Sequence, residues 1–168
     1  MASPRSKLRE LEDRYAPDDE RPLGGYLVAL SSYATVVSGL VALLARRGGP
    51  PEHLANRDLA LAGLATFRAS RLITEASVTA PLRAPFVRYA GSGGPGEVSE
   101  QVQAPDGGHR HALGELVTCP YCFGMWTATV FGFGMALAPR WTRFAASVLA
   151  IDAGSDIMQK LYSDLQAR

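Results

Sequence analysis

The chain has 168 residues and a mass of 17.9 kDa, about the size of one domain. Its formal net charge of +1 excludes a strongly basic surface for nucleic acid and a strongly acidic tail as the main feature. Two cysteines, Cys119 and Cys122, are too few for a secreted scaffold held together by disulfides.

Residues 1–22 are highly charged and rich in proline towards their end, which predicts a solvated N-terminal tail. The leucines and tyrosine between residues 6 and 15 are compatible with a short helix there. No early apolar run with a small-residue cleavage site is present, so we expect no signal peptide.

Residues 24–45 contain no charged side chain. At about 1.5 Å per residue, a helix of this length reaches roughly 33 Å, enough to cross the hydrocarbon core of a bilayer. Tyr26 stands near one end, and Arg46 and Arg47 follow the other, as is typical of residues at membrane interfaces. The segment is therefore predicted to span a membrane.

A Gly-Gly-Pro-Pro break over residues 48–51 separates this segment from a second predicted helix over 57–76. That helix is amphipathic, because Arg68, Arg71 and Glu75 occupy its second half. Its hydropathy leaves open whether it crosses the membrane fully.

Residues 77–118 form the longest polar connection. Pro81 and Pro85 argue against a regular helix in its first part, which suits an interfacial or re-entrant stretch. The glycines and prolines that follow predict a flexible loop over 91–111.

Two further apolar helices are predicted over 120–138 and 141–162. Together with the first two, they indicate an all-α fold: an integral membrane bundle of four helices over residues 23–168, with a long central polar loop. The even number of helices and the excess of Arg and Lys on the side of the termini place both termini in the cytoplasm.

Opposite charges occur at similar predicted depths in the second and fourth helices. Arg68, Arg71 and Glu75 stand in the inner half of one, and Asp152 and Asp156 in the inner half of the other. An ion-pair network explains this arrangement best. Arginines that reach up to the headgroups, or a transport or proton path, are the alternatives.

The Cys119-Pro-Tyr-Cys122 motif is the sharpest local feature, because Pro120 favours the first position of a helix. The positive end of that helix would stabilise a Cys119 thiolate and raise its reactivity. However, a membrane thiol oxidoreductase needs a second cysteine pair, which this sequence lacks. Two small thiols at a helix entry are the simpler interpretation.

Zinc is a second alternative for the same motif. His109, His111, Cys119 and Cys122 contain two imidazoles and two thiols, a valid tetrahedral set. The histidine half is weak, because its two members alternate in direction within a glycine-rich stretch. We therefore expect no cofactor, with zinc as the alternative.

From about residue 57 to 165 the sequence resembles an uncharacterised bacterial membrane-protein family, domain of unknown function 1360. The resemblance rests on Arg71-Leu-Ile-Thr74, on Pro81-Leu-Arg-Ala-Pro-Phe86, and on residues 114–122 with Trp126 following. It implies a membrane location and a bacterial origin but no activity, and it suggests that the marked positions act as one unit.

These observations lean against an enzyme. They favour a multi-pass protein of the bacterial inner membrane that acts as a structural or partner-binding component, with a thiol redox or zinc-binding protein as the alternative. Its expected partners are the lipid bilayer and another membrane protein or a second copy. The expected functional cluster faces the cytoplasm and comprises Arg71, Arg83, Cys119, Cys122, Trp126, Asp152 and Asp156.

Overall fold

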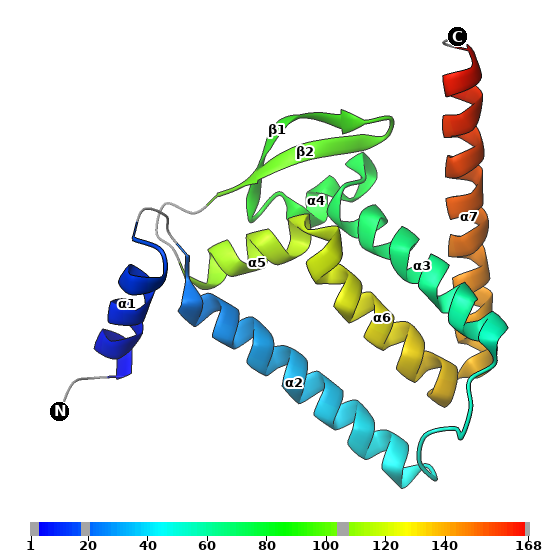
Figure 1. Cartoon of the computed structure of the whole chain (residues 1–168), viewed down its shortest axis with the longest axis horizontal. Coiled ribbons are helices and arrows are strands. Elements are labelled where there is room, and N and C mark those ends of the chain that lie inside the picture. The colour runs from blue at the N-terminus through cyan, green and yellow to red at the C-terminus, as the bar shows by residue number, and fades with distance from the viewer. Residues whose placement is uncertain (1–3, 18–20, 104–107, 167–168) are drawn as a thin grey trace. The chain divides into compact units, whose positions relative to one another are not determined.

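The computed structural model describes residues 4–17, 21–103 and 108–166. In this part of the chain it has seven α-helices, one 3₁₀ helix and one two-stranded sheet (Figure 1). The chain divides into two compact units: a first unit of residues 1–36 and 74–119, and a second unit of residues 37–73 and 120–168.

The first unit contains most of the polar sequence. Helix α1 (Pro4–Tyr15) is followed by the start of α2 (Leu23–Arg46), and after residue 74 come the 3₁₀ helix η1 (Ser77–Thr79), α4 (Ala80–Arg83), β1 (Val87–Gly94), β2 (Glu97–Val102) and α5 (His109–Thr118). Helix α5 packs against β2, where an added Cβ at Gly114 would lie 2.6 Å from a methyl of Val102. This close approach requires a glycine at position 114.

Strands β1 and β2 pair antiparallel, with Val87 opposite Val102 and Gly94 opposite Glu97. The pairing is irregular at two places, and Gly91 and Gly94 there have φ angles of 153° and 148°. The flexible loop predicted over 91–111 is therefore wrong for most of its length, although residues 104–107 lie outside the described part. Glycines that seemed to indicate flexibility instead allow the bulges and the turn of a hairpin.

The second unit consists of the end of α2, α3 (Asn56–Thr74), α6 (Pro120–Leu137) and α7 (Pro139–Gln166). Its core is a cluster of four buried residues: Ala65, Phe131, Met135 and Ala146. Five partly buried apolar residues pack against this cluster: Leu54, Leu61, Ala62, Ala69 and Leu149. An added Cβ at Gly134 would lie 2.7 Å from the Thr142 hydroxyl, so glycine at this position allows α6 and α7 to approach closely.

Helices occupy all four apolar segments of the sequence, but the predicted fold class is wrong. The chain is not an all-α bundle of four membrane helices, because it has three further α-helices and a hairpin within the described residues. Among the helices in the described residues, only α2 is clearly able to cross a membrane by length and composition. Helices α5 and α6 meet the same criteria only when they are counted together as one bent span.

The physical reason for the difference lies in charge and length. Helix α3 contains four charged residues among its 19, and α7 extends over 28 residues that include both acidic and basic side chains. Each ionisable group makes the insertion of a helix into lipid less favourable, so apolar stretches alone overstated the number of clear spans. The placement of both termini in the cytoplasm depended on four crossings and has no basis without them.

Candidate functional site

The first turns of α2 are docked on α5 within the first unit. An added Cβ at Gly25 would lie 2.7 Å from both the Ala112 Cβ and the Gly108 carbonyl oxygen, so the two backbones are in direct contact. Beside this contact the Tyr26 hydroxyl donates a hydrogen bond to Glu115 Oε2. Arg21 Nη1 donates to Glu115 Oε1 at 2.9 Å.

We call these residues the α2 docking site: Arg21, Gly25, Tyr26, Ala112 and Glu115. Glu115 is its centre, because one of its carboxylate oxygens accepts a hydrogen bond from Tyr26 in the first turn of α2 and the other from Arg21 just before α2. Helix α1 adds a further contact, since Glu12 accepts a hydrogen bond of 3.1 Å from the Gly24 N–H. That N–H belongs to the first turn of α2 and has no partner within its own helix.

The remainder of α2 is not buried within the protein. Gly25 is its one buried residue, and apolar side chains are exposed along the rest of the helix: Leu27, Val28, Leu30, Val36, Val41 and Leu43. Its most apolar window of 18 residues has a mean hydropathy of 2.0, and none of that window is buried within the protein. The docking site thus holds one end of a long apolar helix.

A second polar site holds α4 against the hairpin. The Arg83 side chain is only 1 % exposed, and its Nε donates to Glu100 Oε2 at 2.6 Å, where the Glu100 side chain is 7 % exposed. Arg83 Nη1 donates to the Thr79 hydroxyl at 2.7 Å, and Nη2 donates to the Ala76 carbonyl at 3.1 Å. Arg83 and Glu100 form a buried pair of opposite charges, and these contacts join η1, α4 and β2.

Ion pairs connect the helices of the second unit. Arg68 on α3 pairs with Asp152 of α7 at 2.5 Å and also with Asp156, so Arg68 has the opposite-charge partners expected for the second and fourth predicted helices. Asp58 pairs with Arg143 at 2.7 Å. The hydrogen bonds that Arg143 donates hold the pKa of Asp58 below its usual value.

The two cysteines stand where one helix ends and the next begins. Cys119 follows α5 with an extended backbone and precedes Pro120, the first residue of α6. Cys119 is partly buried, Cys122 is exposed, and the two are not joined in a disulfide. The interpretation of the pair as two small thiols at a helix entry stays a prediction.

The four residues proposed for zinc do not form a site in the structure. His109 and His111 lie in the first turn of α5, and Cys119 is eight positions after His111, about 12 Å along a helix axis. His111 Nε2 lies 3.4 Å from Glu115 Oε1 instead. No group of three or more His, Cys, Asp and Glu able to hold a metal occurs among the residues with described positions.

The seven residues of the predicted cluster divide between the two units. Arg83 and Cys119 belong to the first unit; Arg71, Cys122, Trp126, Asp152 and Asp156 belong to the second. The Arg71 guanidinium lies 5.9 Å from the centre of the Phe67 ring. Arg83 has Glu100 as its ionic partner, and Asp152 and Asp156 have Arg68. That all seven act together stays a prediction.

Glu115 and Glu100, the acceptors of the two polar sites in the first unit, were not predicted from the sequence. Glu115 could have been noticed because it occurs in the Gly114–Cys122 stretch that carries part of the family resemblance. Glu100 gave no such signal, since it occurs in a segment that resembles a flexible loop. Its role depends on a strand pairing that no local pattern indicates.

The family match concerns the part of the chain that follows α2. Residues 61–162 match the family model described as "Protein of unknown function (DUF1360)". The chain is also 29% identical over 106 residues to the sporulation protein YjcA of Bacillus subtilis (strain 168), which covers 62% of this chain and 90% of YjcA. No solved structure matches the chain. Because the family model covers more than half of the chain, the protein belongs to the DUF1360 family of proteins of unknown function.

Proposed function

We propose that the protein is a membrane-anchored structural component of a bacterial cell, held in the lipid bilayer by α2 and acting through a protein partner or a second copy. The observation that carries this proposal is the exposure of α2. Its uncharged apolar surface is not buried within the protein, whereas its first turns are fixed to α5.

The hydrophobic effect gives the reason. Exposed apolar surface costs roughly 25 cal/mol for each Å² left in water, and a helix of 24 residues with an apolar surface on all sides would expose a large area. A core helix of a soluble protein avoids this cost by packing, which α2 does not do along its length. A bilayer removes the same surface from water without requiring protein contacts.

The docking site couples this anchor to a folded unit. Hydrogen bonds from Arg21 and Tyr26 to Glu115, together with the close contact at Gly25, fix the first unit to the polar end of α2. Tyr26 and Arg21 are also residue types that are favoured at a membrane interface. A rigid junction of this kind suits a protein that presents a folded unit at a membrane surface.

The similarity to YjcA suggests the cellular process in which the protein acts. YjcA is described as a sporulation protein, and we extend a role in that process to this chain. Helix α2 lies outside the family match of residues 61–162, so the anchor is proposed from the structure alone.

Substituting Leu30 and Val36 together by aspartate tests the anchor. Each charge near the middle of a span costs about 2.5–3.5 kcal/mol on insertion scales, so we expect the double variant to leave the membrane fraction. The measurement is flotation of the full-length chain with cell membranes in a density gradient. The matched control carries Val78→Asp and Leu82→Asp, because both of these residues are exposed apolar side chains outside α2.

The control variant should float with the membranes like the unaltered chain. Equal flotation of the α2 variant and the control would contradict a role of α2 as the anchor. A soluble unaltered chain, found monomeric in the absence of lipid and detergent, would reject the proposed function altogether.

Substituting both Cys119 and Cys122 by serine tests the non-enzymatic part of the proposal. Serine is close in size to cysteine but does not supply a comparable nucleophile or a disulfide partner, so we expect unchanged flotation and unchanged sporulation in a complemented deletion strain. Loss of sporulation by a serine variant that still folds and floats would instead indicate thiol chemistry. Measuring zinc in the purified unaltered chain separates a metal-binding role from a redox role.

A further inference from the structure

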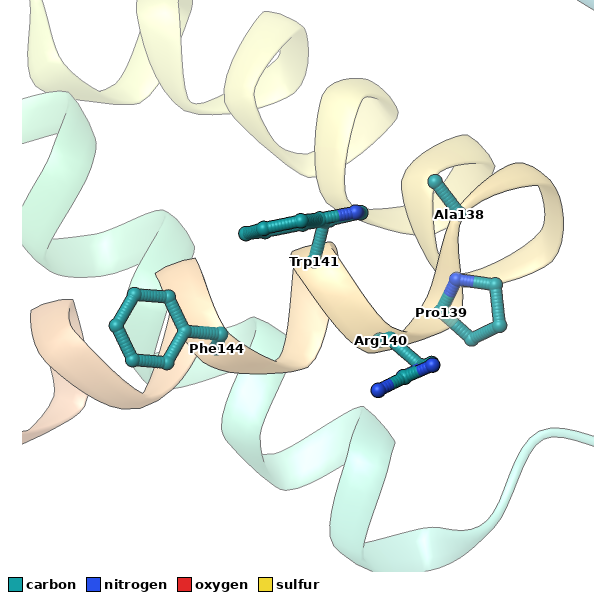
Figure 2. Close-up of a pocket in the computed structure, with 5 residues that line it drawn as sticks. All are labelled: Ala138, Pro139, Arg140, Trp141 and Phe144. Carbon is teal, nitrogen blue, oxygen red and sulfur yellow. The ribbon is translucent and has the colours of Figure 1, made fainter.

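The turn between α6 and α7 carries exposed aromatic side chains beside an arginine. A hollow of about 490 Å³ there is lined by Ala138, Pro139, Arg140, Trp141 and Phe144 (Figure 2). Trp141 is 78 % exposed and Phe144 66 % exposed, although both are large aromatic residues. Aromatic surface left in water at one place marks a site of interaction.

The charges around this turn are mainly positive. Arg140 lines the hollow, and the first turn of α7 contains no acidic residue. Nearby, Asp58 at the start of α3 is bound to Arg143 of α7, and Arg57 is exposed beside it. These residues therefore comprise three arginines and one carboxylate, an excess of positive charge that suits an anionic ligand surface.

The turn also belongs to the unit in which α2 ends. Arg46 is the last residue of α2, and ten residues on, Asn56 begins α3, so the two lie at most about 35 Å apart. Leu54 in this connection packs against the core of the second unit. The Asp58–Arg143 ion pair then joins the start of α3 to the start of α7. The turn is thus held within reach of the end of the proposed anchor.

We propose that the α6–α7 turn rests in the headgroup region of an anionic phospholipid membrane, with Trp141 and Phe144 at the boundary of the acyl chains and Arg140 paired with a lipid phosphate. Tryptophan is favoured at this depth because its ring is apolar while its N–H still reaches polar groups. This inference rests on the proposed function, since it needs the membrane to which α2 attaches the chain.

Fluorescence of Trp141 tests the contact in the full-length chain reconstituted into vesicles. The chain has two tryptophans, so Trp126→Phe leaves Trp141 as the single emitter. We expect its emission to be quenched by lipids brominated on the upper part of the acyl chain and protected from aqueous iodide. Should Trp126→Phe fold poorly, the difference between the unaltered chain and Trp141→Phe gives the same signal.

Arg140→Gln supplies the charge control. In vesicles that contain phosphatidylglycerol, we expect the ratio of lipid-quenched to iodide-quenched Trp141 to fall about fivefold. In vesicles of phosphatidylcholine alone, the substitution should change little. If Arg140→Gln leaves the quenching ratio unchanged in both lipids, the pairing with a phosphate is overturned.

Flotation of the same vesicles separates the two proposals. If the chain floats while Trp141 stays open to iodide and is not quenched by brominated lipid, the contact at the turn is wrong and the anchor stands. If Trp141 is shielded from iodide without lipid quenching, a protein surface covers the turn and the inference is overturned. If the chain does not float, both proposals fail.

Discussion

We expect Arg83→Ala to destabilise the first unit by about 3–5 kcal/mol, the usual cost of removing one partner of a buried ion pair. The Glu100 carboxylate would stay buried without its guanidinium partner, and the Thr79 hydroxyl and Ala76 carbonyl would each lose a hydrogen bond. Because a domain is stable by about 5–15 kcal/mol in total, this is a large part of the whole.

Hydrogen exchange of the hairpin in the detergent-solubilised full-length chain measures this effect. The expected loss corresponds to a decrease in protection of about 100- to 3000-fold, since each 1.4 kcal/mol is a factor of ten. The Val98 N–H, which bonds to the Glu75 carbonyl at 2.9 Å, and the Gln103 N–H, which bonds to the Phe86 carbonyl at 2.9 Å, report on the two ends of β2.

Two variants separate loss of the ion pair from loss of any arginine. Arg88→Ala removes an exposed arginine from β1 and should change protection little. Arg83→Met combined with Glu100→Leu removes both charges and should recover much of the stability, because two apolar side chains replace a balanced pair. If Arg83→Ala behaves like Arg88→Ala, the buried pair does not hold the hairpin.

The same residues show where sequence patterns stop being informative. The helical segments were predictable because helix periodicity and the Pro and Gly breaks are local: α6 begins at Pro120 as expected, and α2 extends only one residue beyond each predicted end. The hairpin was not predictable. Its glycine-rich sequence is typical of a flexible loop. Its stability depends on contacts with residues outside the two strands, such as Arg83 and Gly114.

Among the polar interactions, too, some were predictable from the sequence and others were not. Charges of opposite sign at similar depths in two helices predicted an interaction that the structure shows between Arg68 and the aspartates Asp152 and Asp156. In contrast, Tyr26 and Glu115 are 89 positions apart, and nothing in the sequence links a tyrosine at the start of an apolar helix with a glutamate before a cysteine. Long-range pairs of this kind need the fold before they can be recognised.

The other large effect is expected at the α2 docking site, where Gly25→Ala should cost about 1–3 kcal/mol of contact between α2 and α5. The new methyl group would meet the Ala112 Cβ and the backbone oxygen of Gly108, and neither is the movable end of a flexible side chain. Gly39→Ala is the matched control on the same helix, because no atom lies within 4 Å of its added Cβ. That control should be neutral or slightly stabilising, as alanine favours a helix over glycine.

Hydrogen exchange of residues 109–118, read beside flotation, separates docking from anchoring. Gly25→Ala should increase exchange in α5 while leaving flotation unchanged, because the apolar surface of α2 beyond Gly25 is intact. Gly39→Ala should change neither measurement. If Gly25→Ala left exchange in α5 as slow as Gly39→Ala does, the close contact would not fix the helix. If Gly25→Ala weakens the contact between α2 and α5 but leaves the chain attached to the membrane, then lipid, and not the first unit, accommodates the apolar length of α2.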